Sequence, residues 1–352
     1  MIITFYDKNF KGLQNNASLV VDTATNSFAL TKRGVEMDGL TCYSEAFTED
    51  IQPVFLVIKD DYGRYVYGAL AGIPEITNKN QTKVNASDLK TMLVGDIISE
   101  FTENQHEYVH EVLTHLFNDF KNQIVQGTVS VELQIKTQAT GISLSDFTYI
   151  VGKQKYDCWT EIKNYLKYYN LYMTTQIDIV NKKVVFIIGK AMNKNVNIKL
   201  WEYEDTKNYG KWIADINETQ GYVNLSGTWT PGTKWILTKD NRVTTNEANR
   251  NIYPVKRKVF VENTEDTGAV TELLKKANIE ALTVLTESLY NEDIIIPVDK
   301  LQAIDFETKF SIYVKRGEPL YKELPCGELQ YDQGGLKRVK IGYRFTGIEF
   351  LR

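Results

Sequence analysis

A His-Glu-x-x-His motif is formed by His106, Glu107, Tyr108, Val109 and His110. On a helix this spacing places two imidazoles on one face, where they can bind zinc while the glutamate activates a metal-bound water. A third ligand is not evident, because His115 lies one position away from the place where an extended form of the motif has its next histidine. Two interpretations stay open, a zinc-dependent hydrolase and the solvated edge of a helix, and we favour the second.

Other catalytic devices are absent from the sequence. It has no Gly-x-Ser-x-Gly elbow, no Walker loop, no dinucleotide-binding glycine pattern after a strand, and no cysteine beside a plausible histidine. We therefore predict no catalytic residue, no cofactor-binding residue and no metal ligand, and we expect the protein not to be an enzyme.

Two kinds of side-chain cluster remain that could bind another molecule. Basic clusters at residues 256–258 and 337–340 are interpreted as solvated strand edges or, alternatively, as contacts to a polyanion. Aromatic clusters are interpreted as core or subunit interface, or alternatively as a sugar-stacking surface of a carbohydrate-binding module. The aromatic residues are Tyr165, Tyr168, Tyr169, Tyr172, Trp201, Tyr203, Tyr209 and Trp212.

Composition limits the classes to which the protein can belong. The 352 residues suggest two or three compact units, and 43% hydrophobic residues exclude disorder of the whole chain. With Lys+Arg 41 and Asp+Glu 45, the net charge of −4 provides no overall basic field for tight nucleic-acid binding.

The cysteines Cys42, Cys158 and Cys326 are far apart, so neither a disulfide framework nor a zinc ribbon is expected. The sequence shows no secretory signal and no apolar run long enough to span a membrane, so we expect cytosolic synthesis and assembly.

The elements that must position these residues alternate between β-rich and mixed segments. Residues 1–100 predict strands, with a hairpin at 54–67 and a short capped helix at 89–93. Residues 101–190 predict a helix at 103–122 from its apolar steps of three and four, an alternating strand at 129–135, a helix at 158–169 and a hairpin at 171–188. Strands return at 196–262, and the remaining elements are a long amphipathic helix at 267–291 and a final β region at 324–350.

The two β regions end in similar sequences. Residues 67–75 and 342–350 both place Gly-Ile, as Gly72-Ile73 and Gly347-Ile348, shortly after a β run. The match rests on a few positions, and it is explained either by a duplication or by chance.

The order of elements resembles that of the baseplate hub or tail-tip (tail-associated) proteins of tailed bacteriophages. The resemblance rests on residues 2–10, on 66–73 leading to 86–93, on 156–162 with the following hairpin, and on 251–256 before the long helix and the final β segment. It covers nearly the whole chain.

The resemblance implies an α+β, β-rich fold with two duplicated β-barrel-like domains and two α+β domains, interleaved. The expected domains are a β-barrel-like domain at 1–100, an α+β domain at 101–192, a second, split β-barrel-like domain at 193–250 and 300–352, and a helix-containing α+β domain at 251–299. Because the chain stops at Arg352, directly after the last barrel strand, we expect the short form without a lysin domain.

The function implied is that of a structural component of a phage or prophage tail tip or baseplate. Three copies are expected to form a homotrimeric hub that closes the distal end of the tail tube and matches its sixfold symmetry to a threefold tip. The expected partners are other tail proteins, namely the distal tail ring, the tape measure and receptor-binding proteins, with DNA only passing through the channel. The expected location is the virion tail, assembled in the host bacterial cytoplasm.

Overall fold

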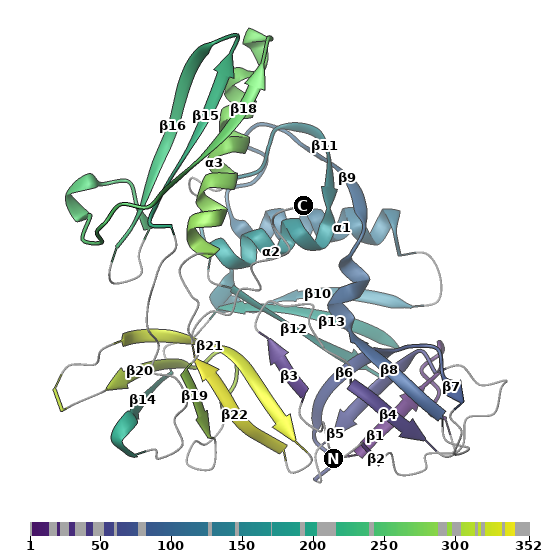
Figure 1. The fold of residues 1–352 in the computed structure, drawn as a ribbon. Coiled ribbons are helices and arrows are strands. Elements are labelled where there is room, and N and C mark those ends of the chain that lie inside the picture. The colour runs from purple at the N-terminus through teal and green to yellow at the C-terminus, as the bar shows by residue number, and fades with distance from the viewer. Residues whose placement is uncertain are drawn as a thin grey trace.

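The computed structural model arranges the chain in three levels (Figure 1). In that view two β-sheet units lie side by side at the bottom, a layer containing two helices lies above them, and a unit of strands and one helix projects at the top. The structure describes residues 2–13, 20–21, 28–31, 40–44, 53–59, 62–76, 82–125, 129–144, 148–169, 171–190, 194–202, 216–238, 243–287, 294–297, 304–313, 316–317, 321–332 and 335–341. Strands outnumber helices among them, so the predicted β-rich α+β class is confirmed.

The N-terminal strands form the first sheet, in the order β1-β5-β6-β8-β4-β2 with β7 paired to β8. They are β1 (Ile2–Tyr6), β2 (Val20–Val21), β4 (Leu40–Ser44), β5 (Phe55–Lys59), β6 (Tyr65–Ala71), β7 (Glu75–Ile76) and β8 (Thr82–Asp88). Successive side chains of a strand point to opposite faces. Phe55 and Val57 of β5 therefore join the large core shared with the helices, whereas Leu56 and Ile58 pack in a separate core inside the first unit. Burial on both faces explains why β5 reads as a continuous apolar run.

The predicted short helix after this sheet is the 3₁₀ turn η1 (Leu89–Leu93). The Asp88 carboxylate caps it by accepting the N–H of Lys90 at 2.7 Å, and it also accepts the Tyr67 hydroxyl at 2.7 Å. This cap joins the end of β8 to the neighbouring strand β6 and so fixes the exit of the chain from the first unit.

The middle layer combines two helices with five strands. These are α1 (Val109–Gln123), α2 (Cys158–Tyr168), β9 (Asp96–Phe101), β10 (Ser130–Ile135), β11 (Gly152–Asp157), β12 (Leu171–Asp178) and β13 (Lys183–Lys190). Strand β13 is central, parallel to β10 and antiparallel to β12, while β9 and β11 form an antiparallel pair. Asp157 caps α2, because its Oδ1 accepts the N–H of Thr160 at 2.8 Å. The predicted order of helix, strand, helix and hairpin is observed.

Helix α1 begins six residues later than the sequence predicts. Glu111 Oε2 accepts the backbone N–H of Glu107 at 2.8 Å and that of Tyr108 at 3.0 Å. These bonds cap the N-terminus of the helix, so α1 begins after Tyr108. Tyr108 also forms a β-bridge with Ser143. The apolar face begins at Val109, as predicted, but periodicity does not show which polar residues before it belong to the helix.

The C-terminal strands form the second sheet, in the order β14-β20-β21-β22-β19. They are β14 (Asn195–Lys199), β19 (Ile294–Pro297), β20 (Lys309–Tyr313), β21 (Tyr321–Asp332) and β22 (Gly335–Ile341). A further strand from the first hundred residues, β3 (Phe28–Thr31), pairs antiparallel with β21. The sequence analysis assigns residues 28–31 to the first β unit. In the structure β3 instead pairs with the second sheet, and it thereby joins the two β units.

The projecting unit consists of a four-stranded sheet covered on one face by α3 (Val270–Glu287). Its strands are β15 (Glu218–Leu225), β16 (Thr228–Leu237), β17 (Val243–Thr244) and β18 (Arg257–Thr264), in the order β17-β16-β15-β18. The close approach of α3 requires glycine on β15, because a Cβ at Gly221 would lie 2.7 Å from the carbonyl carbon of Ala277. Thr219 Oγ1 donates to the Ala281 carbonyl at 2.8 Å on the same face. The opposite face of the sheet is not covered by the helix.

Strand pairing crosses one of the predicted segment boundaries. β15 pairs in parallel with β18, from Glu218 opposite Arg257 to Leu225 opposite Thr264. The sequence analysis places β15 in the split β-barrel-like domain (193–250 and 300–352) and β18 in the helix-containing domain (251–299). Strands β15, β16 and β17 therefore lie in one sheet with β18, whereas β14 is the one described strand of 193–250 that joins the C-terminal sheet. The physical reason is that a strand pattern fixes which residues share a face but not which strand becomes the neighbour. The domain bounds themselves stay a prediction.

Parts of the predicted β segments at 196–262 and 324–350 lie outside the described residues. The second of the two Gly-Ile sequences, Gly347-Ile348, is among them.

Candidate functional site

The His-Glu-x-x-His motif does not have the geometry of a zinc site. His106 and Glu107 precede the first residue of α1, so only His110 is helical and the two histidines do not share a helix face. His106 Nε2 instead lies 3.1 Å from Nδ1 of His115, the third histidine of the chain. The centres of these two rings are 5.2 Å apart, so the two nitrogens lie close to the line between the ring centres and point at each other. A metal bound by both would need them to point at a third position.

Hydrogen bonds explain this histidine pair as part of the packing of α1 on β9. Asp119 accepts the Ser99 hydroxyl at 2.5 Å and lies 3.2 Å from His115 Nε2. A carboxylate only accepts, so in a neutral His115 ring the tautomer that suits Asp119 has its proton on Nε2 and leaves Nδ1 to accept from His106 Nε2. Phe101 stacks on the His115 ring at 4.5 Å. Burial, followed by the nearby His115, lowers the pKa of His106. The chain thus uses these groups to fix a helix on a strand.

The aromatic clusters divide between the core and the surface. Tyr165 and Tyr172 are buried, and the Tyr172 hydroxyl donates to Glu307 at 2.6 Å. Trp201 is 48% exposed. Tyr203, Tyr209 and Trp212 and the side chain of Tyr168 lie outside the described residues. The predicted core role is therefore observed for the first two, and the sugar-stacking alternative is left with one exposed tryptophan among the described members of its cluster.

Two cysteine side chains, those of Cys158 and Cys326, are described, and they form no disulfide. Both are fully buried, and burial raises the pKa of the Cys158 thiol to about 12. Their role is to fill the core.

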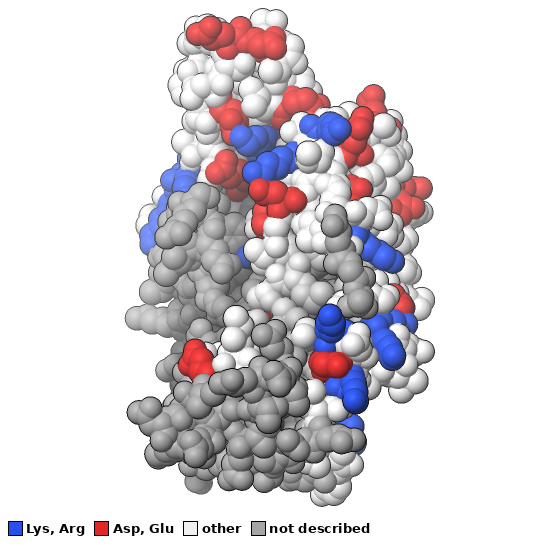
Figure 2. All heavy atoms as spheres, turned by 90° about the vertical axis from the view of Figure 1, so that its right-hand side faces the viewer, with Lys and Arg blue, Asp and Glu red and all other residues white. Residues whose placement is uncertain are grey.

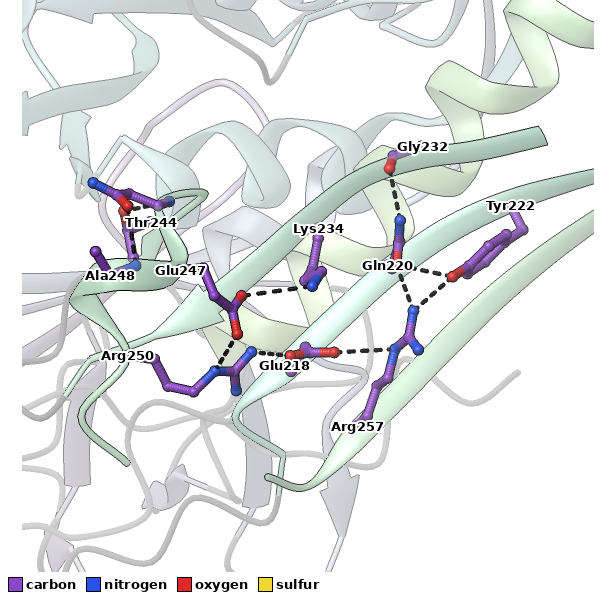
Figure 3. Close-up of polar contacts among 11 residues, drawn as sticks. Glu218, Gln220, Tyr222, Gly232, Lys234, Thr244, Glu247, Ala248, Arg250 and Arg257 are labelled. Carbon is purple, nitrogen blue, oxygen red and sulfur yellow. Dashed lines mark hydrogen bonds and ion pairs between the residues drawn. The ribbon is translucent and has the colours of Figure 1, made fainter. Parts of the chain in front are cut away.

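A dense polar arrangement of described residues lies on the projecting sheet and includes Arg257, from the basic cluster that the sequence indicates at 256–258 (Figure 3). Glu218, at the start of β15, bonds to two arginines: Nη2 of Arg250 and Nε of Arg257, the latter at 3.1 Å. The side chains of Glu218 and Arg250 are 7% and 6% exposed. Arg250 Nε also donates to Glu247 at 2.7 Å, and Glu247 lies 3.5 Å from Lys234 Nζ. Three cations and two carboxylates thus form one chain of ion pairs with a net charge of +1.

Local structure explains how these side chains meet. Residues 218, 220 and 222 of β15 share the face that α3 leaves open, because every second side chain of a strand points the same way. The loop after β17 is fixed by Asn246, whose Oδ1 accepts the N–H of Ala248 at 3.0 Å, and this turn brings Glu247 and Arg250 to the base of the sheet. The Arg250 hydrogen bond lowers the pKa of Glu247.

Arg257 links this ion network to the open face of the sheet. Its Nη2 donates to Gln220 Oε1 and, at 2.6 Å, to the Tyr222 hydroxyl, and its guanidinium lies 5.8 Å from the centre of the Tyr222 ring. Trp229 meets the same tyrosine ring edge-on at 6.2 Å. The sequence signal that could have indicated this site is the polar side chain at every second position of β15, in Glu218, Gln220 and Tyr222. The sequence does not show that Arg250 and Arg257 lie beside these residues.

Sequence comparisons assign no family: no family model matches the chain, and no curated protein matches it. Solved structures do match. A prophage tail protein of Listeria monocytogenes aligns with 99% of this chain and 96% of its own, at 11% identity and a TM-score of 0.49. The 43 kDa tail protein of prophage MuSo2 from Shewanella oneidensis aligns over 90% and 93% respectively, at 12% identity and a TM-score of 0.48.

A third structure aligns over 92% of both chains, at 10% identity and a TM-score of 0.46, and comes from Neisseria meningitidis. All three are tail proteins. The resemblance found in the sequence names the same class of protein.

Within the described ranges, no group of three or more His, Cys, Asp or Glu side chains is arranged to hold a metal ion. No helix in the same ranges is both long enough and apolar enough to cross a membrane.

Proposed function

We propose that this chain is a structural subunit of a phage or prophage tail tip or baseplate. Three copies form a hub that closes the distal end of the tail tube and connects it to receptor-binding or host-penetration parts. The sequence resemblance over nearly the whole chain supports this proposal.

The observation that carries the proposal is the placement of the two β units. Strands from the first hundred residues and from the last sixty lie side by side at one end of the molecule, joined by the pairing of β3 with β21 (Figure 1). In the described residues the first sheet ends at β1 and β2, and the second ends at β14 and β19. Outer strands present backbone groups that can pair with another subunit, which is what closure of a ring from two β units per chain requires.

Charge is consistent with a channel through which DNA passes. Three copies carry 3 × (−4) = −12, and a mildly acidic channel repels the phosphate backbone, so that DNA moves through without binding. Acidic and basic side chains are mixed on the described part of the face in Figure 2, with no broad basic area.

In this proposal the protein acts through its shape and makes no bond. Its partners are other tail proteins, namely the distal tail ring, the tape measure and receptor-binding proteins, and its place is the virion tail after assembly in the host cytoplasm. Neither alternative, a zinc hydrolase or a carbohydrate-binding module, is favoured by a contact in the described part of the chain.

Two measurements test the proposal. Sedimentation velocity of the purified protein across a concentration series is expected to show a trimer. Electron micrographs of tails labelled with an antibody to this chain are expected to show label at the distal end. Label along the tube or on the capsid would overturn the proposed location, and a monomer at every concentration and in isolated tail tips would overturn the trimer.

A further inference from the structure

Two histidine side chains attach the connection between β9 and α1 to the helix. His106 Nε2 lies 3.1 Å from Nδ1 of His115, and Gln105 Nε2 lies 3.3 Å from the same nitrogen. The orientation of the Gln105 amide follows from its other end, because its Oε1 accepts the N–H of Thr102 at 2.8 Å. One nitrogen of α1 therefore contacts two neighbouring residues of the connection.

The helix binds the two parts of this connection in different ways. Glu111 Oε2 accepts the N–H groups of Glu107 and Tyr108, and neither bond involves an imidazole. Residues 102–105 are exposed, and within the described part of the chain Gln105 is the one of these four with a side-chain bond to α1. The attachment of the earlier part to α1 therefore depends on the histidine pair, whereas that of the later part does not.

The number of protons on the pair decides whether the two rings can stay together. A single hydrogen between the facing nitrogens makes the bond, both in the neutral pair and after one added proton, because the other nitrogen can still accept. A second added proton places a hydrogen on both facing nitrogens, so neither accepts, and two cations face each other across 3.1 Å. Gln105 also loses its acceptor, since an amide nitrogen only donates. The doubly charged pair therefore repels the connection from the helix.

The groups around the pair set the pH at which the second proton is added. Among the described residues, the titratable groups that face it are Asp119 and Glu111 of α1, Tyr149 before β11, and Tyr156 of β11, which lies behind the Phe101 ring. Burial and then the nearby His115 lower the pKa of His106, and together they outweigh the opposite effect of Glu111. The second proton is therefore added below about pH 6.5, where an exposed imidazole charges.

We infer that His106 and His115 form an acid-released clasp, which binds residues 102–106 to α1 at neutral pH and lets them separate once both rings are charged. Helix α1 and its cap stay in place, because the bonds that Glu111 accepts do not depend on the imidazoles. The clasp concerns the conformation of a single chain, so this inference does not rest on the proposed trimer.

Opening of the clasp exposes an aromatic surface. The His106 ring packs edge-on against Phe101 and Tyr149, with ring centres 5.9 Å and 5.6 Å apart. Phe101 and Tyr149 are 1% and 6% exposed in the closed arrangement. Acid therefore changes both the position of the connection and the apolar area that this end of the middle layer presents.

Hydrogen exchange read by mass spectrometry tests the clasp between about pH 7.5 and about pH 5, a range that spans the charging of an imidazole. Each exchange rate is compared with that of an unstructured peptide at the same pH, so the resulting protection factor depends on structure alone. Protection of residues 102–106 is expected to fall by up to about tenfold per pH unit below about pH 6.5. His106→Gln and His115→Gln are expected to show no such fall. The matched control is His110→Gln, because His110 lies on the same helix outside the pair, and it is expected to behave as the unaltered protein.

Three outcomes of this series overturn the clasp. The first is constant protection of residues 102–106 in the unaltered protein, and the second is an equal fall in the unaltered protein and in His106→Gln. The third is equal exchange of residues 102–106 and of β13 at every pH, because the whole chain would then unfold together.

Nuclear magnetic resonance of the histidine rings provides the second measurement. The chain has three histidines, so each ring signal is assigned from the variant that lacks it. In His115→Gln the midpoint of the His106 titration is expected to move up towards about pH 6.5, because one of the two causes of its lowered pKa is removed. An unchanged midpoint overturns the direct coupling of the two rings.

Discussion

Replacing Glu218 by glutamine removes the carboxylate that two arginines share at the base of the projecting sheet. The side chains of Glu218 and Arg250 are nearly fully buried, so the change leaves a buried guanidinium with Glu247 as its remaining charged partner. Loss of one partner of a buried ion pair costs about 3–5 kcal/mol. Glutamine keeps the size and one acceptor, so we expect a loss at the lower end of that range, about 3 kcal/mol.

Hydrogen exchange followed by mass spectrometry measures this loss locally. A loss of about 3 kcal/mol corresponds to roughly a hundredfold faster exchange of the amides of β15 and β18. The control is the same substitution at Glu202, which pairs with Lys199 at 3.2 Å where both side chains are 50% exposed. That pair contributes about 0.5 kcal/mol or less. Equal exchange rates in the two variants would show that the network does not stabilise the sheet.

Three further outcomes are expected. Gly221→Ala places a Cβ 2.7 Å from the Ala277 backbone and is expected to destabilise the packing of α3 by about 1–3 kcal/mol in urea unfolding, whereas unchanged stability would contradict the close approach. The pKa of His106 is lowered by burial and then by His115, so the folded state binds fewer protons than the unfolded state just below pH 6.5. Stability is therefore expected to fall as the pH drops through 6.5, and less so in His106→Gln; an identical slope in both proteins would refute this. Burial raises the pKa of Cys158 to about 12, so iodoacetamide at pH 8 is expected to label it only after unfolding, as read by peptide mass spectrometry.

Local patterns predicted much of the secondary structure. The apolar face of α1, which includes Val112, Leu116 and Phe120, follows directly from steps of three and four residues. The caps at Asp88 and Asp157 were recognisable because a short acidic side chain before a helix can accept the free N–H groups of its first turn. The apolar face and the two caps depend on residues a few positions apart in the sequence. They can therefore be predicted from the sequence without knowing the tertiary structure.

The start of α1 shows where local reasoning stops. The His-Glu-x-x-His spacing suggests a helix that includes His106, yet Glu111 accepts the N–H groups of Glu107 and Tyr108 and so begins the helix after them. As a result His106 meets His115. Spacing predicts a shared face only if every residue between the two is helical.

The sequence by itself determined the β-rich α+β class and the faces of the main helices and strands. Only the tertiary structure decided that β3 joins β21, that β15 lies beside β18, and that Glu218 is enclosed by Arg250 and Arg257. The physical reason is that every strand carries the same backbone donors and acceptors. Its neighbour is therefore selected by loop closure and by burial summed over the whole chain, and neither is written in the residues of one strand.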